Sequence, residues 1–262
     1  MVTEQPIVAF LYDFDKTLCT TDMEDYTFIP ALGYKPAEFW KKANDFGYNN
    51  RMDGLLAYMY TMIREAERKH LPFTRADLVE KGRSIVLFPG VESWFDRINA
   101  FGREQGVQVE HYIISSGLTD IIKVSAIGDR FKAVFAASFC YDEHGMACWP
   151  AMAVNYTSKT QFLFRVNKGV LDVTEHRALN EFMPEEKRRV PFSNMIYIGD
   201  GLTDVPSMKL TKLNGGHSIA VWQEDEQISN EMLLEGRVDF AVKADYSRGS
   251  DMEKMVFAII DQ

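Results

Sequence analysis

The chain has 262 residues, of which 46% are hydrophobic and 26% are charged, and its formal net charge is −9 at pH 7. This length accommodates one large core with a modest insertion, and the composition is ordinary for a globular protein. The negative charge, and the lack of a lysine- or arginine-rich stripe, argue against nucleic acid or an anionic membrane as a partner. The three cysteines have no metal-binding spacing, no apolar run approaches membrane length and no signal peptide is evident, so we expect a cytoplasmic protein with reduced thiols.

Two aspartates follow the first predicted strand. The apolar run from residue 7 to residue 12 leads directly into Asp13 and Asp15, which are one residue apart. In an extended chain both side chains lie on the same face, because strand side chains alternate. Like charges this close shift each other's pKa or hold a cation between them. The pair therefore predicts a carboxylate nucleophile beside a carboxylic acid, although an acidic turn after a strand would have the same sequence.

Residues 20–88 have the sequence of several short helices with turn residues between them. The predicted helices cover residues 21–32, 36–46, 52–70 and 75–85. After this stretch, predicted strands and helices alternate to the end of the chain, with a hairpin turn at residues 141–146. Alternation of this kind predicts a parallel α/β sheet with right-handed crossovers.

Two weaker signals lie in the middle of the chain. A predicted strand ends in Ser115-Ser116-Gly117, and Lys159 stands just before an apolar helix pattern. Hydroxyl and cationic donors suit the equatorial oxygens of a phosphoryl group. Taken singly, a serine after a strand is usually a turn residue and a lysine before a helix is usually solvated.

A second acidic pair follows a later predicted strand. The apolar run 195–198 leads into Gly199-Asp200-Gly201, and Asp204 comes three residues further on. In open parallel sheets, ligands bind outside the carboxyl ends of the strands. The two acidic strand ends together predict one Mg²⁺ site, because hard oxygen ligands suit that ion. The glycines do not form a dinucleotide fingerprint, because Asp204 stands where the third glycine would be.

These four signals, in this order, resemble the motifs of the haloacid dehalogenase superfamily of hydrolases. They are Asp-x-Asp-x-Thr, a strand followed by serine, a lysine, and Gly-Asp-x-x-x-Asp. The resemblance covers nearly the whole chain and is greatest to the phosphoserine phosphatase-like branch. It implies a Rossmann-like α/β core domain, residues 1–19 and 89–262, with helices on its faces. An α-helical cap domain, residues 20–88, would be inserted between the first and second motifs.

The resemblance also implies roles for single residues. The catalytic residues would be Asp13 as nucleophile, Asp15 as general acid and base, Ser115 as a phosphoryl ligand, and Lys159 as the counter-charge. Thr17, Ser116 and Gly117 would belong to the loops around the substrate, with Ser116 the less favoured phosphoryl ligand. Asp13, the backbone carbonyl of Asp15, Asp200 and Asp204 would hold Mg²⁺, with Asp204 acting directly or through water. To act as an acid, Asp15 needs a pKa raised by burial and by its neighbouring carboxylate.

The implied activity is Mg²⁺-dependent hydrolysis of a small phosphorylated metabolite through an aspartyl-phosphate intermediate. Asp22 stands nine residues after Asp13, where phosphoserine phosphatases keep a glutamate for the substrate's amino group, although Asp22 could equally cap a helix. Their cap arginine for the substrate carboxylate has no clear counterpart, with Arg51 and Arg64 as the candidates. Phosphoserine-like substrates, phosphoethanolamine and phosphocholine therefore stay open. The alternatives are a phosphotransferase or mutase on the same scaffold and a catalytically silent phosphate-binding protein.

Overall fold

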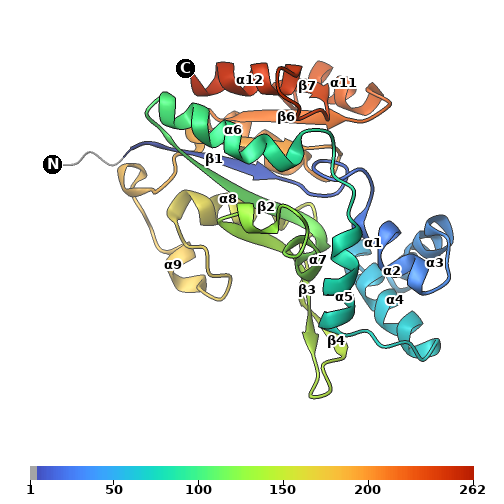
Figure 1. Cartoon of the computed structure of the whole chain (residues 1–262). Helices are drawn as coiled ribbons and strands as arrows, with labels where there is room; N and C mark the ends of the chain where they lie inside the picture. The colour runs from blue at the N-terminus through green and yellow to red at the C-terminus, as the bar shows by residue number, and fades with distance from the viewer. Residues whose placement is uncertain (1–4) are drawn as a thin grey trace.

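The computed structural model describes residues 5–262, so the first four residues of the predicted core segment 1–19 lie outside it. Its centre is a seven-stranded sheet with the strand order β4-β3-β2-β1-β5-β6-β7 (Figure 1). The strands are β1 (Ile7–Tyr12), β2 (Gln108–Leu118), β3 (Ala133–Tyr141), β4 (Ala147–Met152), β5 (Met195–Gly199), β6 (His217–Trp222) and β7 (Phe240–Lys243). Neighbouring strands are parallel except β3 and β4, which form an antiparallel hairpin. The predicted α/β class with a mostly parallel sheet is confirmed.

Helices cover both faces of this sheet. They are α6 (Val91–Glu104) and α12 (Asp251–Ile260) on one face, and α8 (Lys159–Lys168), α10 (Val205–Leu213) and α11 (Gln227–Leu234) on the other. In the central strand β1, Phe10 and Tyr12 contact the first layer, whereas Ala9 and Leu11 contact the second. A strand that is covered on both faces is apolar throughout, which explains the unbroken apolar run before Asp13.

The chain between β1 and α6 forms a helical segment beyond the carboxyl end of β1 (Figure 1). Its helices are α1 (Met23–Tyr26), α2 (Phe28–Ala31), α3 (Pro36–Asn50), α4 (Gly54–Arg68) and α5 (Arg75–Lys81). The chain enters and leaves this segment side by side. The Thr20 N–H donates to the Val86 carbonyl at 3.0 Å, and the Phe88 N–H donates to the Leu18 carbonyl at 3.0 Å. Entering and leaving segments that lie side by side are typical of an insertion. The exact domain limits, 20 and 88, stay a prediction.

Two of the predicted helix boundaries in this segment are wrong. The stretch 21–32 forms two short helices instead of one, and they are separated at Thr27, where φ is −112°. The expected turn at residues 47–50 is the last turn of α3, which ends at Asn50 and is followed by Arg51 with a φ of 51°. A Cβ on Gly47 would lie 3.0 Å from the Cβ of Ala57 in α4, so this glycine permits close packing of two helices.

The β3–β4 hairpin extends past the sheet and packs against the helical segment (Figure 1). The Ala147 N–H donates to the Phe73 carbonyl at 2.7 Å, and the rings of Phe73 and Phe139 lie 5.1 Å apart. The hairpin turn predicted at residues 141–146 is confirmed. The hairpin thus connects the sheet to the helical segment at a second place, well away from β1.

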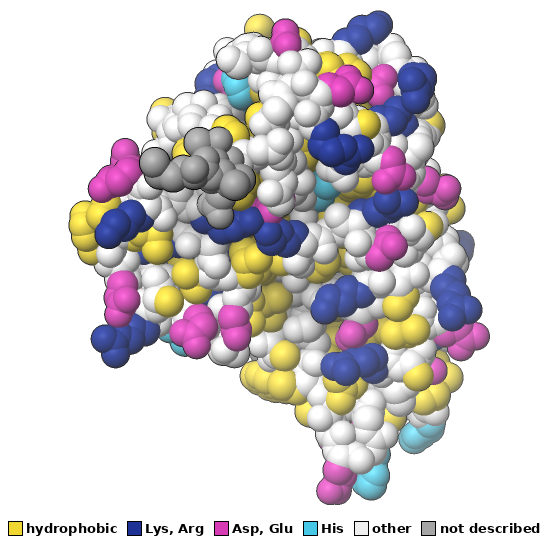
Figure 2. Space-filling view, turned by 60° about the vertical axis from the view of Figure 1, so that its left-hand side comes forward, with side chains coloured by type: hydrophobic (Ala, Val, Ile, Leu, Met, Phe, Trp, Pro, Cys, Tyr) yellow, Lys and Arg dark blue, Asp and Glu magenta, His cyan; other side chains and the backbone are white. Residues whose placement is uncertain are grey.

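The remaining elements are short. They are α7 (Thr119–Ile122), α9 (His176–Asn180) and 3₁₀ turns at Gly82–Ser84, Gly128–Arg130, Glu185–Lys187 and Phe192–Asn194. Within residues 5–262, no helix combines the length and the apolarity that a membrane crossing requires. On the face seen in Figure 2, basic and acidic side chains are interspersed and form no basic stripe.

Candidate active site

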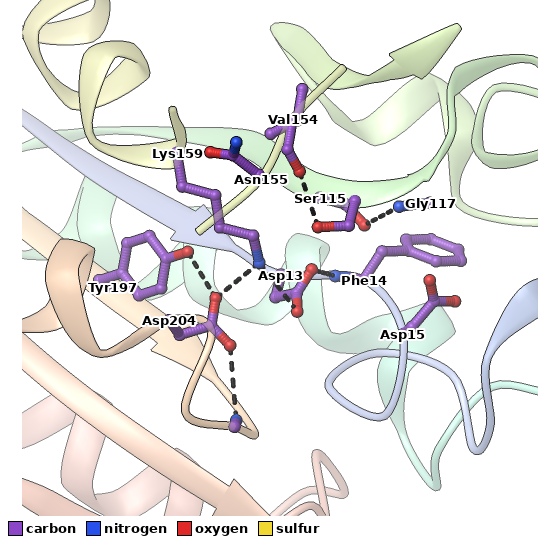
Figure 3. A network of polar contacts seen from close by, with 12 residues as sticks. Asp13, Phe14, Asp15, Ser115, Gly117, Val154, Asn155, Lys159, Tyr197 and Asp204 are labelled. Carbon is purple, nitrogen blue, oxygen red and sulfur yellow. Dashed lines mark hydrogen bonds and ion pairs between the residues drawn. The ribbon is translucent and has the colours of Figure 1, made fainter. Parts of the chain in front are cut away.

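Asp13 lies at the carboxyl end of β1. Its backbone N–H donates to the Ile198 carbonyl of β5 at 2.9 Å, and its Oδ1 accepts from the Phe14 N–H at 2.7 Å (Figure 3). The residue is 7% exposed. Burial raises the pKa of Asp13 to about 6, and the neighbouring Lys159 opposes this rise. A carboxylate held in one orientation in this way is suited to nucleophilic attack once it is ionised.

The Lys159 ammonium joins two carboxylates from different strand ends. Lys159 is the first residue of α8 and is 1% exposed. Its Nζ lies 3.1 Å from Asp13 Oδ2 and 2.7 Å from Asp204 Oδ1 (Figure 3). Burial alone would lower the pKa of Lys159, but the two carboxylates raise it above its ordinary value. The lysine is therefore charged and can stabilise negative charge that develops beside Asp13.

Asp200 completes an acidic cluster after β5. Carboxylate oxygens of Asp13, Asp200 and Asp204 lie within 4.8 Å of one another. Burial, and then the charges of Asp13 and Asp204, raise the pKa of Asp200 well above its ordinary value. Lys159 pairs with two of these carboxylates, whereas Asp200 has no ion-pair partner among residues 5–262. Three carboxylates, of which two share the Lys159 ammonium, fit a divalent cation, and an all-oxygen donor set suits Mg²⁺.

Gly199 makes room for the Asp204 carboxylate. A Cβ on Gly199 would lie 2.5 Å from Asp204 Cγ, which is closer than such atoms approach in proteins. Asp204 is fully buried at the start of α10, and its carboxylate turns back toward β5. The close approach of the backbone at Gly199 therefore occurs within the acidic cluster itself.

Asp15 lies on the other side of Asp13 from Lys159 (Figure 3). Its Oδ1 accepts from the first backbone N–H of α1 at 2.9 Å. Burial, and then the charges of Glu24, Asp13 and Asp22, raise the pKa of this carboxyl well above its ordinary value. This shift favours the protonated form of Asp15, which is the form that a general acid requires.

The two serines at the end of β2 have different surroundings. Ser115 is fully buried, its Oγ accepts from the Gly117 N–H at 3.0 Å, and no residue within 5–262 accepts its hydroxyl hydrogen. The Ser116 hydroxyl donates to the Val154 carbonyl at 2.7 Å. A Cβ on Gly117 would lie 2.7 Å from Asp15 Oδ2, so glycine brings this loop against the acidic pair. Ser115 is thus the freer donor, and the predicted preference for it fits this geometry.

The loop between Asp15 and α1 is fixed from several sides. Lys16 has a φ of 54°, and its Nζ lies 2.6 Å from Asp22 Oδ2. Thr17 is buried, its carbonyl accepts from the Tyr246 hydroxyl at 2.8 Å, and its own hydroxyl has no partner among residues 5–262. Asp22 is therefore already paired with a lysine of its own loop.

Two residues near this site were not predicted from the sequence. The Tyr197 hydroxyl donates to Asp204 Oδ1 at 2.8 Å, inside the core (Figure 3). Glu24 is 2% exposed, its Oε1 has no hydrogen-bond partner among residues 5–262, and burial raises its pKa to about 8. The signal for Tyr197 in the sequence was its position inside an apolar strand, because a buried hydroxyl needs a hydrogen-bond partner. Glu24 gave no comparable signal, since an acid in a short helix is usually solvated.

Comparison with known proteins shows the family of this chain. Residues 10–209 match the model of the haloacid dehalogenase-like hydrolase family. An uncharacterized protein of Borreliella burgdorferi is 26% identical over 293 residues, which cover 99% of this chain and 100% of that one.

Three solved structures have a similar fold. A family hydrolase of Salmonella enterica serovar Typhi has a TM-score of 0.63 at 16% identity, covering 98% of this chain and 73% of that one. A substrate-bound phosphoserine phosphatase has a TM-score of 0.61 at 13% identity, covering 97% of this chain and 98% of that one. A probable phosphoserine phosphatase of Vibrio cholerae has a TM-score of 0.62 at 13% identity, covering 98% of this chain and 65% of that one. At these identities the likeness concerns the fold.

Proposed function

Because the chain belongs to the haloacid dehalogenase-like hydrolases, we propose that it is a Mg²⁺-dependent phosphatase acting on a small phosphomonoester. The observation that carries the proposal is the placement of Asp13. This buried carboxylate lies 3.1 Å from the Lys159 ammonium and belongs to a cluster of three carboxylates. A nucleophile beside a fixed cation and a site for a second cation is what phosphoryl transfer requires.

The reaction would proceed in two steps. In the first, an Asp13 oxygen attacks phosphorus, the bond from phosphorus to the ester oxygen breaks, and Asp15 gives its proton to the departing alcohol. In the second, water attacks phosphorus, the bond to Asp13 breaks, and Asp15 takes up a proton from the water. Two such steps replace one with a higher barrier. The Ser115 hydroxyl and the Lys159 ammonium would bind phosphoryl oxygens.

The acidic cluster supports the metal assignment. Asp13, Asp200 and Asp204 would hold Mg²⁺, which when bound would neutralise charge on the phosphoryl oxygens. Asp204 Oδ1 already accepts from both Lys159 and Tyr197. We therefore propose that this oxygen acts on Mg²⁺ through a water molecule or through Lys159, and not by direct contact with the ion. Asp200, without an ion-pair partner among residues 5–262, is the carboxylate most available to the ion.

For the substrate, we propose the phosphate ester of an alcohol that carries a cationic amine. Glu24 is buried near Asp15, the acid that would protonate the departing alcohol, and its Oε1 has no partner among residues 5–262. A buried acid without a partner costs free energy that a bound ammonium group would recover. Tyr58 lies near the same acids, and its ring centroid is 5.6 Å from that of Trp40, so aromatic faces border this region.

The candidate arginines do not support a substrate carboxylate. The Arg64 side chain is 59% exposed and pairs with Glu67, and Arg51 is exposed at the end of α3. Asp22, the residue at the phosphoserine phosphatase position, is paired with Lys16. Phosphoethanolamine and phosphocholine therefore fit the described residues better than phosphoserine does.

Phosphate release from a panel of phosphomonoesters tests the proposal. We expect phosphate release to require both Mg²⁺ and Asp13. EDTA and the Asp13→Asn substitution should therefore each abolish it. Phosphoethanolamine or phosphocholine should react faster than glycerol phosphate, and Glu24→Gln should raise KM for the amines about tenfold or more while leaving KM for glycerol phosphate unchanged. Turnover unaffected by Asp13→Asn would refute the aspartyl-phosphate step. Solvent ¹⁸O in the released phosphate distinguishes hydrolysis from transfer to an acceptor alcohol.

A further inference from the structure

Helix α4 contacts both loops that carry the predicted phosphoryl ligands. The Tyr58 hydroxyl donates to the Ser116 carbonyl at 2.8 Å. Asp53, at the N-terminal cap of the same helix, accepts from Asn155 Nδ2 at 3.1 Å through its Oδ2. Ser116 follows the predicted phosphoryl-binding serine, and Asn155 begins the turn that leads into Lys159. One helix of the inserted segment therefore holds two separate parts of the site.

These contacts close into a ring, which we call the α4 ring. The Ser116 hydroxyl donates to the Val154 carbonyl at 2.7 Å, and Val154 precedes Asn155 (Figure 3). The α4 ring thus runs from Asp53 along α4 to Tyr58, then to Ser116 and Val154, and returns from Asn155 to Asp53. It spans the gap between β2 and α8, across which a phosphoryl group would have to be bound from both sides.

Asn155 transmits its position to Lys159. Its Oδ1 accepts from the Thr157 N–H at 3.1 Å and from the Ser158 N–H at 2.8 Å. Its carbonyl accepts from the Lys159 N–H at 2.9 Å. The asparagine side chain thus organises the whole turn before α8, and its remaining amide group is the one that bonds to α4. A shift of Asn155 would move the first residue of α8, whose ammonium lies 3.1 Å from Asp13.

We infer that the Asp53–Asn155 hydrogen bond positions Lys159 from the helical segment. The inference rests on the proposed function for its effect on catalysis. Asp53 and Asn155 do not touch the reacting atoms and are positioning residues. Near-attack geometry is sensitive to displacements of about 1 Å, so loosening this bond has a kinetic cost even though the bond lies away from the nucleophile.

An exchange of donor and acceptor tests this assignment. In Asn155→Asp, a carboxylate oxygen can still accept from the Thr157 and Ser158 N–H groups, but two carboxylates now face each other between the turn and α4. Adding Asp53→Asn restores an amide donor to the pair, while the asparagine oxygen still caps α4 in place of the original Oδ1, which accepts from the Leu55 N–H at 3.0 Å. The double variant thus rebuilds the bond with its direction reversed.

Asn155→Asp should lower kcat about tenfold or more, and the double variant should return it to within about threefold of wild type. The affinity for inorganic phosphate, measured with Mg²⁺ present, should likewise fall in Asn155→Asp and recover in the double variant. Asn50→Asp, which adds the same charge at the exposed end of α3, is the matched control and should leave both unchanged. A kcat that is unchanged in Asn155→Asp, or a double variant no better than the single one, would overturn the inference.

Hydrogen exchange provides a readout that does not need turnover. The amides of residues 157–159 should exchange at least about tenfold faster in Asn155→Asp than in wild type and recover in the double variant. If wild type hydrolyses no phosphomonoester, the proposed function fails while this measurement still decides on the α4 ring. Equal exchange in all three proteins, or a lower melting temperature in Asn155→Asp with unchanged exchange and kcat, would mean that the bond only stabilises the fold.

Discussion

Tyr197 donates its hydroxyl hydrogen to Asp204 Oδ1, the same oxygen that lies 2.7 Å from the Lys159 ammonium. Two donors on one oxygen share its negative charge, so the attraction between Lys159 and Asp204 is weaker than that of an isolated pair. The same ammonium lies 3.1 Å from Asp13 Oδ2. Asp204 and Lys159 therefore link the Tyr197 hydroxyl to the proposed nucleophile.

Removing this hydroxyl should therefore affect catalysis more than a structural tyrosine would. In Tyr197→Phe, Asp204 would attract Lys159 more strongly, and we expect kcat to fall about tenfold with KM nearly unchanged. The free energy of unfolding should fall by about 1 kcal/mol. Tyr112→Phe is the matched control, because the Tyr112 hydroxyl bonds to Glu110 at 2.5 Å outside the acidic cluster. An equal loss of kcat in both variants would remove Tyr197 from the site.

Gly199 and Gly201 offer a second matched pair. In Gly199→Ala, the new Cβ would lie 2.5 Å from Asp204 Cγ, whereas at Gly201 the nearest atom is Thr203 Oγ1 at 3.9 Å. Gly199→Ala should lower the free energy of unfolding by about 1–3 kcal/mol and raise the Mg²⁺ concentration needed for half-maximal activity. Gly201→Ala should stay within about 0.5 kcal/mol of wild type. Urea unfolding and Mg²⁺ titration measure both effects, and similar behaviour of the two variants would contradict this account of the cluster.

The pH dependence of kcat/KM should have two limbs. Asp13 attacks as a carboxylate, so the rate should fall as the pH drops through the Asp13 pKa, which burial raises to about 6 and which a bound cation would lower. Asp15 acts as an acid, so the rate should also fall as the pH rises through its raised pKa. In Asp15→Asn the basic limb should disappear and kcat should fall by about two to four orders of magnitude. A basic limb that persists in this variant would assign it to another group.

Glu24→Gln should make the protein more stable at alkaline pH. Burial raises the pKa of Glu24 from its ordinary value of 4.5 to about 8 in the folded state. Wild-type stability due to Glu24 is thus complete below pH 4.5 and is lost as the pH rises toward and through 8, since the unfolded state releases the proton first. Relative to wild type, Glu24→Gln should gain about 3–4 kcal/mol between pH 5 and pH 8. A difference between the two proteins that does not change with pH would show that Glu24 is ionised in the fold.

The main strand-end motifs were evident in the sequence for a local reason. A central strand covered on both faces must be apolar, so the polar residues that follow it stand out at Asp13 and again at Asp200. Because the carboxyl ends of parallel strands lie at the same edge of a sheet, the sequence also indicated that the residues after these strands would lie close together. Three of the predicted Mg²⁺ donors, the carboxylates of Asp13, Asp200 and Asp204, accordingly have oxygens within 4.8 Å of one another.

Local patterns gave less information about the inserted segment. Gly47 was expected in a turn, but it packs against Ala57 within α3 and α4, and this contact depends on how two helices cross. Asp22 stands at a family position, yet in the structure it pairs with Lys16. Among residues 5–262, the buried carboxyl oxygen that lacks a hydrogen-bond partner is Oε1 of Glu24. Both outcomes follow from burial and neighbours rather than from residue type.

The sequence by itself therefore determined the α/β class, the order of the motifs and the carboxylates that gather at the strand ends, because each depends on residues close together in the chain. Tertiary structure alone decided the contacts of Tyr197 with Asp204 and of Asp53 with Asn155. Partners of the second pair are 102 residues apart, and no local pattern specifies which polar groups meet once the chain is packed. Hydrogen-bond partners in a buried site depend on the packing of the whole fold, because a buried polar group can bond only to the neighbours that packing supplies.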